Sequence, residues 1–589
     1  MIRYYFTVSL ILISIFHINS KAESTSTKYA FINSGIITGE YAVPDCPDWL
    51  HIAVIYQVYP QSFYDSDGDG IGDLKGIIKK LDYIKSLGVD GIWINPFFES
   101  SFFDGGYDIT DYYKVDNRYG ANEDAKLLFE EAEKRGLKII FDYVISYTSI
   151  LHPWFQESAK QKKNRYTNWY IWTDNVWIDP PMAFRHSFIK GYGNRNGQYM
   201  YNFYWCQPAL NFGFVKPEGP WMLPPNHPDI LALHEELIKV LRFWMDMGAD
   251  GFRADMAGAL VKNANVTKND PEYNNRDEAT KEFWRKIRNI IDNDYPDAFM
   301  VAEWGYPEVA LDNCFHADFF HWFPGFNDLY QKESWRILNG HSEGYSFFDS
   351  AGKGNITYFL EKYMDQYKKT KGKGYIILPL GNHDLSRLNI KRSYDELEMI
   401  FAFAFTMPGI PFIYYGNEIG MRQLYDVPIK EGAYPPRAGA RTPMQWKKDK
   451  NFGFSTAPAE NIYLPVDPDP DAPTVAEQEQ DPNSLLNKVR QLIKLKHSEP
   501  ALAAYAEFVP IYAKENDYPF IFARAVKEDI ILVIFNPSNR EVNANFKLNI
   551  KAKNLKLIFG KESNVKVNGN HYEVKVKPIS YSIYKVNRN

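Results

Sequence analysis

Three short apolar segments of this 589-residue chain end on, or lead directly to, an acidic side chain. They are residues 250–255 with Asp255, residues 298–303 with Glu303, and residues 375–380, which lead to Asp384. We interpret each segment as a strand. Alternate residues of a strand share one face, so Arg253 and Asp255 point the same way. An arginine and a carboxylate on one face of a buried strand are costly unless they form an ion pair or take part in chemistry.

Carboxylates at the ends of several strands favour chemistry over a purely structural ion pair. A parallel α/β barrel collects the C-terminal ends of its strands at one face, and its chemistry lies there. Glycoside hydrolysis requires two carboxylates, and a third group can orient the sugar. For Arg253 and Asp255 alone, a structural ion pair is the alternative. The additional carboxylates of Glu303 and Asp384 make a glycosidase site the better interpretation.

Three motifs follow one another along the chain: GFRAD at residues 251–255, AEWG at residues 302–305 and GNHD at residues 381–384. In this order they resemble the α-amylase superfamily of retaining glycoside hydrolases (glycoside hydrolase family 13), from about Ile55 to the C-terminus. The segments QVYPQSFYDSDGDGIGDLKGI, GYDITDYY, RTPMQW and DPNSLLN are similar to the α-glucosidase and oligo-1,6-glucosidase branch, with trehalose synthase nearby. The resemblance implies an α/β fold: a TIM (β/α)8 barrel, a domain B inserted after strand three and a C-terminal antiparallel β-sandwich.

The resemblance also implies a role for each site residue. Asp255 would be the nucleophile and Glu303 the general acid and base, while Arg253 would keep Asp255 ionised, since a nearby cation lowers a carboxyl pKa. Asp384 would be the third catalytic carboxylate and would grip sugar hydroxyls together with His383. The other substrate contacts that the resemblance implies are Tyr107, which stacks on the sugar, and Asp108 and Arg387, which close the pocket around the non-reducing end.

The third strand carries a departure from the family pattern. The family sequence reads D-x-V-x-N-H-T-S, with a histidine that bonds the sugar, whereas this chain has Ser146 and Tyr147 in place of the Asn and His. The flanking residues match, so Tyr147 is expected at the floor of the pocket as a substrate contact. Its hydroxyl can donate a hydrogen bond, but it lies farther from the backbone and stays neutral. A second departure is Ala209, which stands where the glucosidase signature QPDLN has Asp.

Residues 65–73, DSDGDGIGD, alternate Asp with Gly. The carboxylates of such a loop converge and the glycines permit tight turns, which is typical of a cation site. An EF-hand is excluded, because its twelfth position would be Gly76 rather than Glu. A solvated acidic turn is the alternative. The family carries a structural Ca²⁺ here, and by resemblance its ligands are Asp65, Asp67, Asp69, Asp73 and the carbonyl of Ile71.

Residues 1–22 read as a signal peptide. Arg3 gives a positive start, residues 8–16 are apolar, and Ser20-Lys-Ala22 is a small-x-small cleavage site. A membrane anchor is the alternative, but the apolar run is too short to span a bilayer. We therefore expect an exported protein, periplasmic or secreted, without a transmembrane segment. The net charge of −6 gives no reason to propose a nucleic-acid partner.

The length of the chain suits a large barrel with additions. We expect an arm at 23–50, a barrel at 51–145 and 228–500, domain B at 146–227 and the sandwich at 501–589. Further barrel strands are expected at 52–58, 91–95, 138–144 and 411–415, and one amphipathic helix at 74–87. Cys46, Cys206 and Cys314 allow at most one disulfide, and their scatter argues against a disulfide scaffold or a metal cluster.

The leading function is an exo-acting α-glucosidase that cleaves short α-glucan oligosaccharides through a covalent glycosyl-Asp255 intermediate. A transglycosylase or isomerase such as trehalose synthase would share the chemistry up to that intermediate, with a sugar hydroxyl in place of water. The Asp108/Arg387 pair argues against an endo-acting amylase, because it would block the non-reducing side. A non-catalytic sugar-binding barrel is the alternative from another class, and Ser146 and Tyr147 are its support. The sequence leaves the preferred linkage and the oligomeric state open.

Overall fold

A barrel of eight parallel strands lies at the centre of the protein. The computed structural model describes residues 31–588 apart from 182–186, 264–272 and 331–344, so the expected signal peptide lies outside the described residues. The strands follow the order β13-β12-β11-β10-β7-β4-β3-β14. Their bounds are β3 (Ile55–Val58), β4 (Gly91–Ile94), β7 (Lys138–Tyr143), β10 (Gly251–Ala254), β11 (Phe299–Ala302), β12 (Ala317–Phe319), β13 (Tyr375–Ile377) and β14 (Phe412–Tyr414). A parallel bridge from Leu380, just beyond β13, to Ile413 in β14 closes the barrel.

The barrel strands are short apolar segments with buried side chains. Every residue of β10 and β11 is buried, as expected for strands that are covered on both faces. Such strands appear in the sequence as continuous apolar runs, and the pattern predicts seven of the eight. It misses β12, which has only three residues with Asp318 at its centre.

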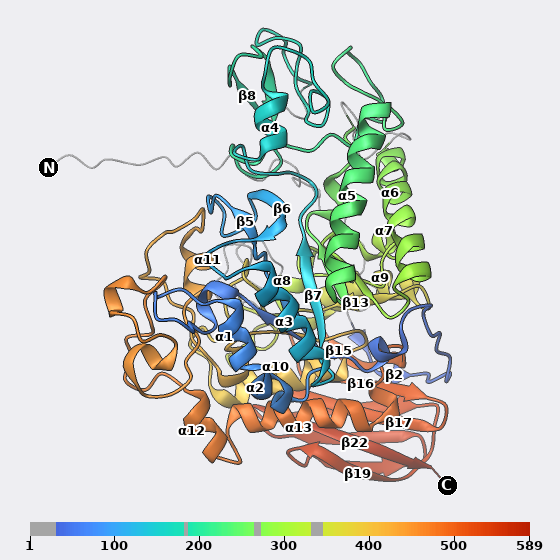
Figure 1. The fold of residues 1–589 in the computed structure, drawn as a ribbon. Coiled ribbons are helices and arrows are strands. Elements are labelled where there is room, and N and C mark those ends of the chain that lie inside the picture. The colour runs from blue at the N-terminus through green and yellow to red at the C-terminus, as the bar shows by residue number, and fades with distance from the viewer. Residues whose placement is uncertain (1–30, 182–186, 264–272, 331–344, 589) are drawn as a thin grey trace, which may run out of the picture.

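Helices surround the barrel (Figure 1). The longer ones are α3 (Asn122–Glu133), α5 (Pro228–Met247), α6 (Tyr273–Asp294), α9 (Ile356–Thr370), α10 (Tyr394–Thr406) and α13 (Leu485–Ser498). The single helix predicted over residues 74–87 is instead two helices, α1 (Leu74–Lys79) and α2 (Leu81–Leu87). The break lies at Lys80, whose φ of −109° and ψ of 3° leave the helical region.

The segment between β7 and α5 forms a lobe beyond the barrel, at the top of Figure 1. It contains α4 (Pro153–Ser158) and a hairpin of β8 (Phe188–Lys190) with β9 (Gln198–Met200). This lobe corresponds to the predicted domain B. An antiparallel bridge between Tyr147 and Ala209 ties its start to its later part. Tyr147 and Ala209, which both depart from the family pattern, are therefore cross-strand neighbours.

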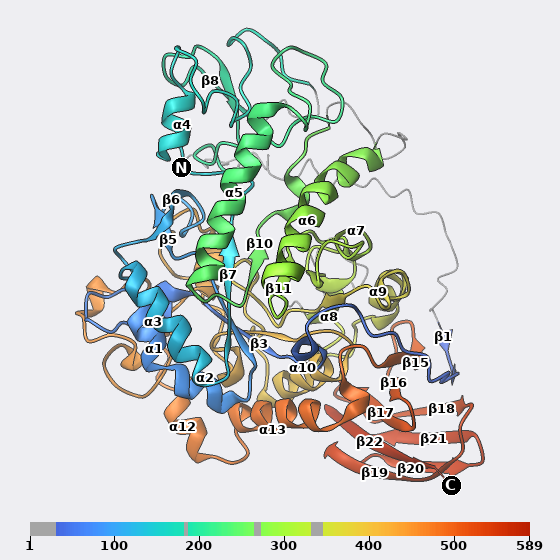
Figure 2. The same cartoon turned by 45° about the vertical axis from the view of Figure 1, so that its right-hand side comes forward.

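The C-terminal residues form two sheets that pack as a sandwich (Figure 2). One sheet has the order β1-β15-β16-β17-β22-β19 and the other β2-β18-β21-β20. Their C-terminal strands are β15 (Glu507–Lys514), β16 (Phe520–Val526), β17 (Asp529–Asn536), β18 (Val542–Leu548), β19 (Ala552–Gly560), β20 (Asn564–Asn568), β21 (His571–Val576) and β22 (Ser580–Arg588). The predicted arm supplies β1 (Phe31–Ile32) and β2 (Ser34–Gly35), so part of it belongs to the sandwich. Only the β2–β18 pairing is parallel among the described sandwich strands.

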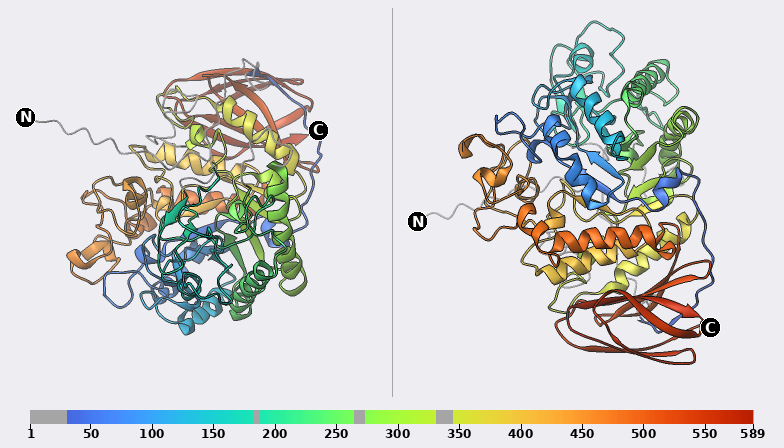
Figure 3. Two further views of the ribbon diagram at one scale, coloured as in Figure 1. Left: turned by 90° about the horizontal axis from the view of Figure 1, so that it is seen from above. Right: turned by 60° about the horizontal axis from the view of Figure 1, so that its bottom comes forward.

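The helices α10 and α13 lie between the barrel and the sandwich (Figure 3). Two fully buried basic side chains hold this boundary. Arg524 of β16 donates to the carbonyl of Thr406, the last residue of α10, at 2.6 Å. Lys496 of α13 donates to the carbonyl of Leu502 at 3.0 Å. Backbone carbonyls rather than carboxylates thus accept from both side chains.

The structure also shows the state of the cysteines and the character of the helices. All three cysteines lie among the described residues and are free thiols, with Cys206 and Cys314 buried and Cys46 partly exposed. The disulfide that the sequence allowed is therefore not formed. Within the same described ranges, no helix combines the length and the apolar character that a membrane crossing requires.

Candidate active site

A single guanidinium joins the carboxylates at the ends of neighbouring barrel strands. Nη1 of Arg253 lies 2.6 Å from Oδ1 of Asp142 and 2.7 Å from Oδ1 of Asp255. Nη2 of the same side chain lies 2.6 Å from Oε2 of Glu303. These four side chains, which we call the catalytic cluster, are between 0% and 10% exposed. The structure thus brings together three predicted site residues and adds Asp142 to them.

The strand register produces this arrangement. Arg253 in β10 is the Cα partner of Asp142 in β7, and partners in adjacent parallel strands point to the same face. Asp255 and Glu303 directly follow β10 and β11. The N–H of Asp255 still donates to a carbonyl of β7 at 3.2 Å, and that of Glu303 to a carbonyl of β10 at 3.0 Å. The ladder therefore fixes the backbone of both carboxylates.

The catalytic cluster holds three carboxylates against one guanidinium. Like charges this close in a buried site cannot all ionise at low cost, so the cluster retains a proton. Burial, assisted by Glu303 and Asp142, raises the pKa of Asp255 well above its usual range against the pull of Arg253. Burial also opposes ionisation of Glu303, but Arg253 and His321 lower its pKa to about 2. The surroundings thus favour the ionised form of Glu303 more than that of Asp255, and the remaining proton is shared within the cluster.

Hydrogen-bond donors surround Glu303. Nε1 of Trp322 donates to its Oε1 at 2.9 Å, and the N–H of Met256 donates to its Oε2 at 3.2 Å. Nε2 of His321 lies 3.7 Å from Oε1, and neither ring nitrogen has a hydrogen-bond partner among the described residues. Asp318 of β12 accepts the N–H of the residue after Glu303 at 2.9 Å. The unpredicted strand β12 and the loop after it thus support the predicted acid.

A second group of side chains reaches the catalytic cluster from the segment after β13 and from the loop between β5 (Phe98–Ser100) and β6 (Ile109–Val115). The rings of Tyr107 and His383 are stacked, with centroids 5.2 Å apart and planes at 7°. The Tyr107 hydroxyl donates to Oδ2 of Asp142 at 2.9 Å. Nε2 of His383 lies 2.7 Å from that hydroxyl and 3.3 Å from Oδ2 of Asp384. Asp142 therefore links this group, through Arg253, to the predicted nucleophile Asp255.

Two arginines close one end of the site around Asp384. Nε of Arg437 donates to Oδ1 of Asp384 at 2.8 Å, while its Nη1 lies 3.4 Å from Oδ1 of Asp104. Nη2 of Arg441 lies 3.3 Å from the same oxygen of Asp384. Domain B contributes Gln207, which donates to Oδ2 of Asp104 at 2.9 Å. Burial opposes ionisation of Asp384, but Arg437 holds its pKa well below its usual range.

The predicted pairing of Asp108 with Arg387 is wrong. Asp108 is fully buried, and its carboxylate accepts the N–H groups of Phe103 and Asp104 at 3.0 Å each. Arg387 donates to the carbonyl of Tyr415 at 2.7 Å. The described structure contains no ion pair between the two. The Asp108 carboxylate instead binds the backbone of its own loop, and Asp104 and Arg437 form the closed end of the site.

Tyr147 lies directly against Asp255, the predicted nucleophile. Its hydroxyl donates to Oδ2 of Asp255 at 2.8 Å, and the side chain is 2% exposed. Burial raises the pKa of Tyr147 well above its ordinary value, so the phenol stays protonated. The hydroxyl of Tyr112 donates to the carbonyl of Tyr147 at 3.1 Å and helps to fix its backbone. The residue expected at the pocket floor as a sugar contact thus contacts a catalytic carboxylate.

Three of the predicted metal ligands converge in the acidic loop. One oxygen each from Asp65, Asp67 and Asp73 lies within 4.8 Å of the others. A group of carboxylate oxygens is what Ca²⁺ prefers, so this donor set fits a hard cation. The carboxylate of Asp69 is not part of the group and accepts the N–H of Ile71 at 2.8 Å.

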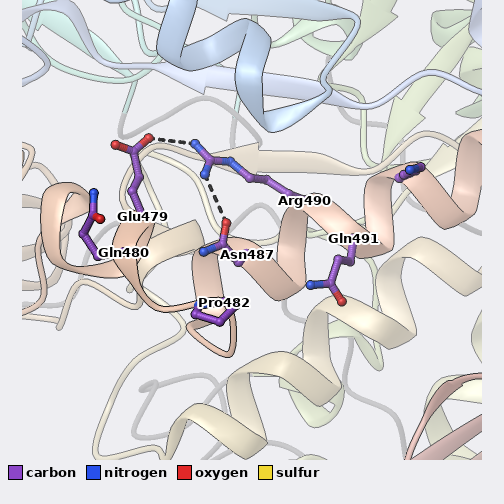
Figure 4. A pocket seen from close by; sticks show the side chains of 7 residues that line it. Glu479, Gln480, Pro482, Asn487, Arg490 and Gln491 are labelled. Atoms are coloured by element: carbon purple, nitrogen blue, oxygen red, sulfur yellow. Dashed lines mark hydrogen bonds and ion pairs between the residues drawn. The ribbon is translucent and has the colours of Figure 1, made fainter.

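A hollow of about 430 Å³ lies away from these residues, between α12 (Val475–Gln480) and the first turns of α13 (Figure 4). Its polar side chains bind one another: Arg490 donates to Glu479 at 2.9 Å and to Asn487 at 3.1 Å. It contains none of the predicted site residues. We therefore assign it no part in the chemistry.

Several residues of the site escape the sequence analysis: Asp104, Asp142, His321, Trp322, Arg437 and Arg441. The position of Asp142 could have predicted it as a site residue, because it lies near the end of an apolar strand, as Asp255 and Glu303 do. Arg441 belongs to the RTPMQW motif, and Arg437 precedes it by one helical turn. His321 carries no comparable signal, because the strand before it is not recognisable.

Residues 57–504 match the family model described as alpha amylase, catalytic domain. A trehalose synthase/amylase from Mycobacterium tuberculosis is 32% identical over 508 residues, which cover 79% of this chain and 78% of that protein. An oligo-1,6-glucosidase from Parageobacillus thermoglucosidasius is 31% identical over 547 residues, covering 84% and 91%. An isomaltulose synthase structure from Erwinia rhapontici NX5 has a TM-score of 0.73 at 26% identity, covering 92% of this chain and 99% of that chain. A trehalulose synthase structure from Pseudomonas mesoacidophila MX-45 has a TM-score of 0.72, with the same identity and coverage. The chain therefore belongs to the α-amylase family, glycoside hydrolase family 13, and is an enzyme that acts on glycosidic bonds.

Proposed function

We propose that this enzyme is a retaining, exo-acting α-glucosidase on short α-glucans. One observation carries the proposal: a single guanidinium, that of Arg253, bridges Asp255 and Glu303 beside an end closed by Arg437. Retention requires the two carboxyl groups to lie about 5–5.5 Å apart. Carboxylates that share one guanidinium are close enough to support such a scheme.

The scheme has two steps. Asp255 attacks the anomeric carbon, the glycosidic C–O bond breaks, and Glu303 gives its proton to the leaving oxygen. Water then attacks the same carbon, gives its proton to Glu303, and the electron pair of the ester bond returns to Asp255. The first step needs the shared proton of the cluster on Glu303 and the negative charge on Asp255. A glycosidic oxygen that displaces Arg253 from Glu303 would remove a strong anion-stabilising contact and move the proton to Glu303.

Exo action rests on the closed end. Asp104 and Arg437 join the loop before β6, domain B and the segment before the RTPMQW motif into one wall. A wall beside Asp384 would stop a glucan chain from continuing on that side and would restrict it to the terminal sugar ring. The wall of Asp104 and Arg437, rather than the expected pair of Asp108 and Arg387, thus disfavours an endo-acting amylase.

An isomerase or transglycosylase is the second candidate. The named relatives and structural neighbours include a trehalose synthase/amylase, an isomaltulose synthase and a trehalulose synthase, each named for the disaccharide it forms. The same glycosyl-Asp255 intermediate would serve, with a sugar hydroxyl as the attacking group. A sugar-binding barrel without turnover is disfavoured, because every member of the catalytic cluster is present and paired.

We also propose a structural Ca²⁺ in the acidic loop, held by Asp65, Asp67 and Asp73, with Asp69 and the Ile71 carbonyl as further expected ligands. The ion would neutralise the loop and would take part in no catalytic step. Export to the periplasm or the exterior likewise stays a proposal, since its sequence signal lies outside the described residues.

The proposal is tested by product analysis and azide rescue. The mature enzyme would be incubated with maltose, isomaltose, trehalose and maltoheptaose. Free glucose supports the glucosidase and identifies its linkage, and rearranged disaccharides support the isomerase. Two variants test the roles with an activated glucoside and azide: Asp255→Gly should form β-glucosyl azide, and Glu303→Ala should form α-glucosyl azide. The same anomer from both variants, or full activity of Asp255→Gly without azide, would refute the scheme.

A further inference from the structure

The carboxylate of Asp255 is held on both of its oxygens by different kinds of donor. Arg253 binds Oδ1 at 2.7 Å with a charged group, and Tyr147 binds Oδ2 at 2.8 Å with a neutral one. The retaining scheme assigns no task to the second donor. We propose that the Tyr147 hydroxyl accelerates breakdown of the covalent intermediate by stabilising the Asp255 carboxylate as it departs. This inference rests on the retaining mechanism proposed above.

The geometry directs the hydroxyl proton of Tyr147 to Asp255 and leaves none for a second acceptor. A phenol has one proton, and here that proton is directed at Asp255. The hydroxyl can still accept a hydrogen bond from a sugar, but it cannot donate to sugar and nucleophile together. Two neighbours fix the backbone of Tyr147: the cross-strand partner Ala209 and the donor Tyr112. Ala209 is small and fully buried, which leaves space on that face for the phenol ring.

The two chemical steps use this donor differently. When the ester forms, the carboxylate loses charge and its hydrogen bond from Tyr147 weakens, because a charged acceptor binds a donor more strongly than a neutral ester. When the ester breaks, the carbon–oxygen electron pair returns to Asp255 and the hydrogen bond strengthens. The hydroxyl therefore stabilises the transition state for breakdown relative to the ester, and it gives no such help to formation, in which the carboxylate loses charge.

The test is Tyr147→Phe, which removes one oxygen atom and keeps the ring. With p-nitrophenyl α-glucoside, kcat should fall roughly ten- to a hundred-fold, while kcat/KM, which reports formation of the intermediate, should not fall. KM should fall with kcat. Rapid mixing should show a nitrophenol burst equal to the enzyme concentration, and intact-protein mass after acid quench should show one added glucosyl group.

The matched control is Tyr170→Phe. Its hydroxyl is also buried in domain B, but it contacts Thr148 at 2.7 Å rather than Asp255. It should leave kcat, KM and the burst unchanged. Tyr147→Met, which fills similar space without a hydroxyl, carries the same prediction if Tyr147→Phe does not fold. Melting temperatures report folding for all three variants.

The outcomes separate this inference from the proposed function. If kcat/KM of a folded Tyr147→Phe enzyme falls as much as kcat and no burst appears, Tyr147 does not act on breakdown, and the inference is overturned while the retaining scheme stands. If the unmodified enzyme turns over no α-glucoside, or Asp255→Asn stays active, the proposed function itself has failed. A burst and an accumulated glucosyl-enzyme support both.

Discussion

Nη1 of Arg437 lies 3.4 Å from Oδ1 of Asp104, although 333 residues separate the two in the chain. The same arginine binds Asp384, so one side chain links the closed end to the catalytic carboxylates. Asp104 in turn accepts from Gln207 of domain B. Three separate segments therefore form the closed end. Disrupting it should change which products are released rather than the steps that break the glycosidic bond.

Asp104→Ala is expected to open this end. The variant removes the carboxylate that Arg437 and Gln207 contact, so KM for maltose should rise about ten-fold, the effect of losing one charged hydrogen bond. Maltoheptaose should then give mid-length products besides glucose, which chromatography would detect. Asp111→Ala, in the neighbouring strand β6, is the control and should keep the original product pattern. Glucose as the sole early product of Asp104→Ala would contradict the assignment.

The pH profile should respond to His321. This side chain favours the ionised form of Glu303, so its removal should raise the pKa of that carboxyl. The cluster would then keep its proton to higher pH, and the alkaline limb of kcat/KM should move to higher pH. His321→Phe keeps an aromatic ring in place and is the variant to measure.

The control for that profile is His234→Phe, a buried histidine of α5 that packs against Phe212 and Phe283. This variant should leave the acidic and alkaline limbs of the kcat/KM profile at the same pH as in the unmodified enzyme. An alkaline limb that stays in place, or moves to lower pH, in His321→Phe would show that His321 does not act on Glu303.

Calcium should stabilise the enzyme through the acidic loop. A ligand at one hundred times its Kd adds about 2.7 kcal/mol to the free energy of unfolding. Thermal melts with Ca²⁺ and with EDTA should therefore differ for the unmodified enzyme. Asp65→Asn should abolish this difference, and the exposed Asp426→Asn should retain it. The calcium dependence is the readout, since Asp65 also accepts the N–H of Gly70 at 2.8 Å and its loss costs stability by itself.

Buried Lys496 should make stability depend on pH. Burial lowers the pKa of Lys496 from 10.5 to about 7 in the folded protein. Between these values the unfolded chain binds a proton that the folded protein does not, so the free energy of unfolding rises with pH by up to about 1.4 kcal/mol per unit. Below about pH 7 both states are protonated and the cost of burying the charge is constant.

Chemical denaturation at several pH values between 7 and 10 measures this effect. The unmodified enzyme should gain stability relative to Lys496→Met as the pH rises. Lys494→Met, on the exposed side of the same helix, should show no such trend relative to the unmodified enzyme. A constant difference between the unmodified enzyme and Lys496→Met would mean that the amine stays charged in the folded protein.

Much of the barrel and of its chemistry is determined locally in the sequence. Apolar runs buried on both faces identify seven strands, and an acidic residue at the end of a run marks its C-terminal edge. Arg253 and Asp255 share a face because strand side chains alternate, which needs no knowledge of the fold. The acidic loop is equally local, since its ligands lie within nine residues of one another.

The tertiary structure alone decides the contacts between distant segments. Asp108 and Arg387 have suitable charges, but Asp108 satisfies its carboxylate on nearby N–H groups, and the pair never forms. The strands β1 and β2 join a sandwich formed some 500 residues later, because they complete sheet edges that no local pattern reveals.

The environment of Asp255 follows partly from the sequence and partly from the tertiary structure. Tyr147 is visible in the sequence as a departure from the family pattern, and its neutral phenol follows from its chemistry. That it donates to Asp255, 108 residues away, depends on β7 and β10 being adjacent and on the bridge to Ala209. Residue types thus supply the carboxylates and donors, whereas strand order and packing decide which of them meet, because hydrogen bonds act only over about 3 Å.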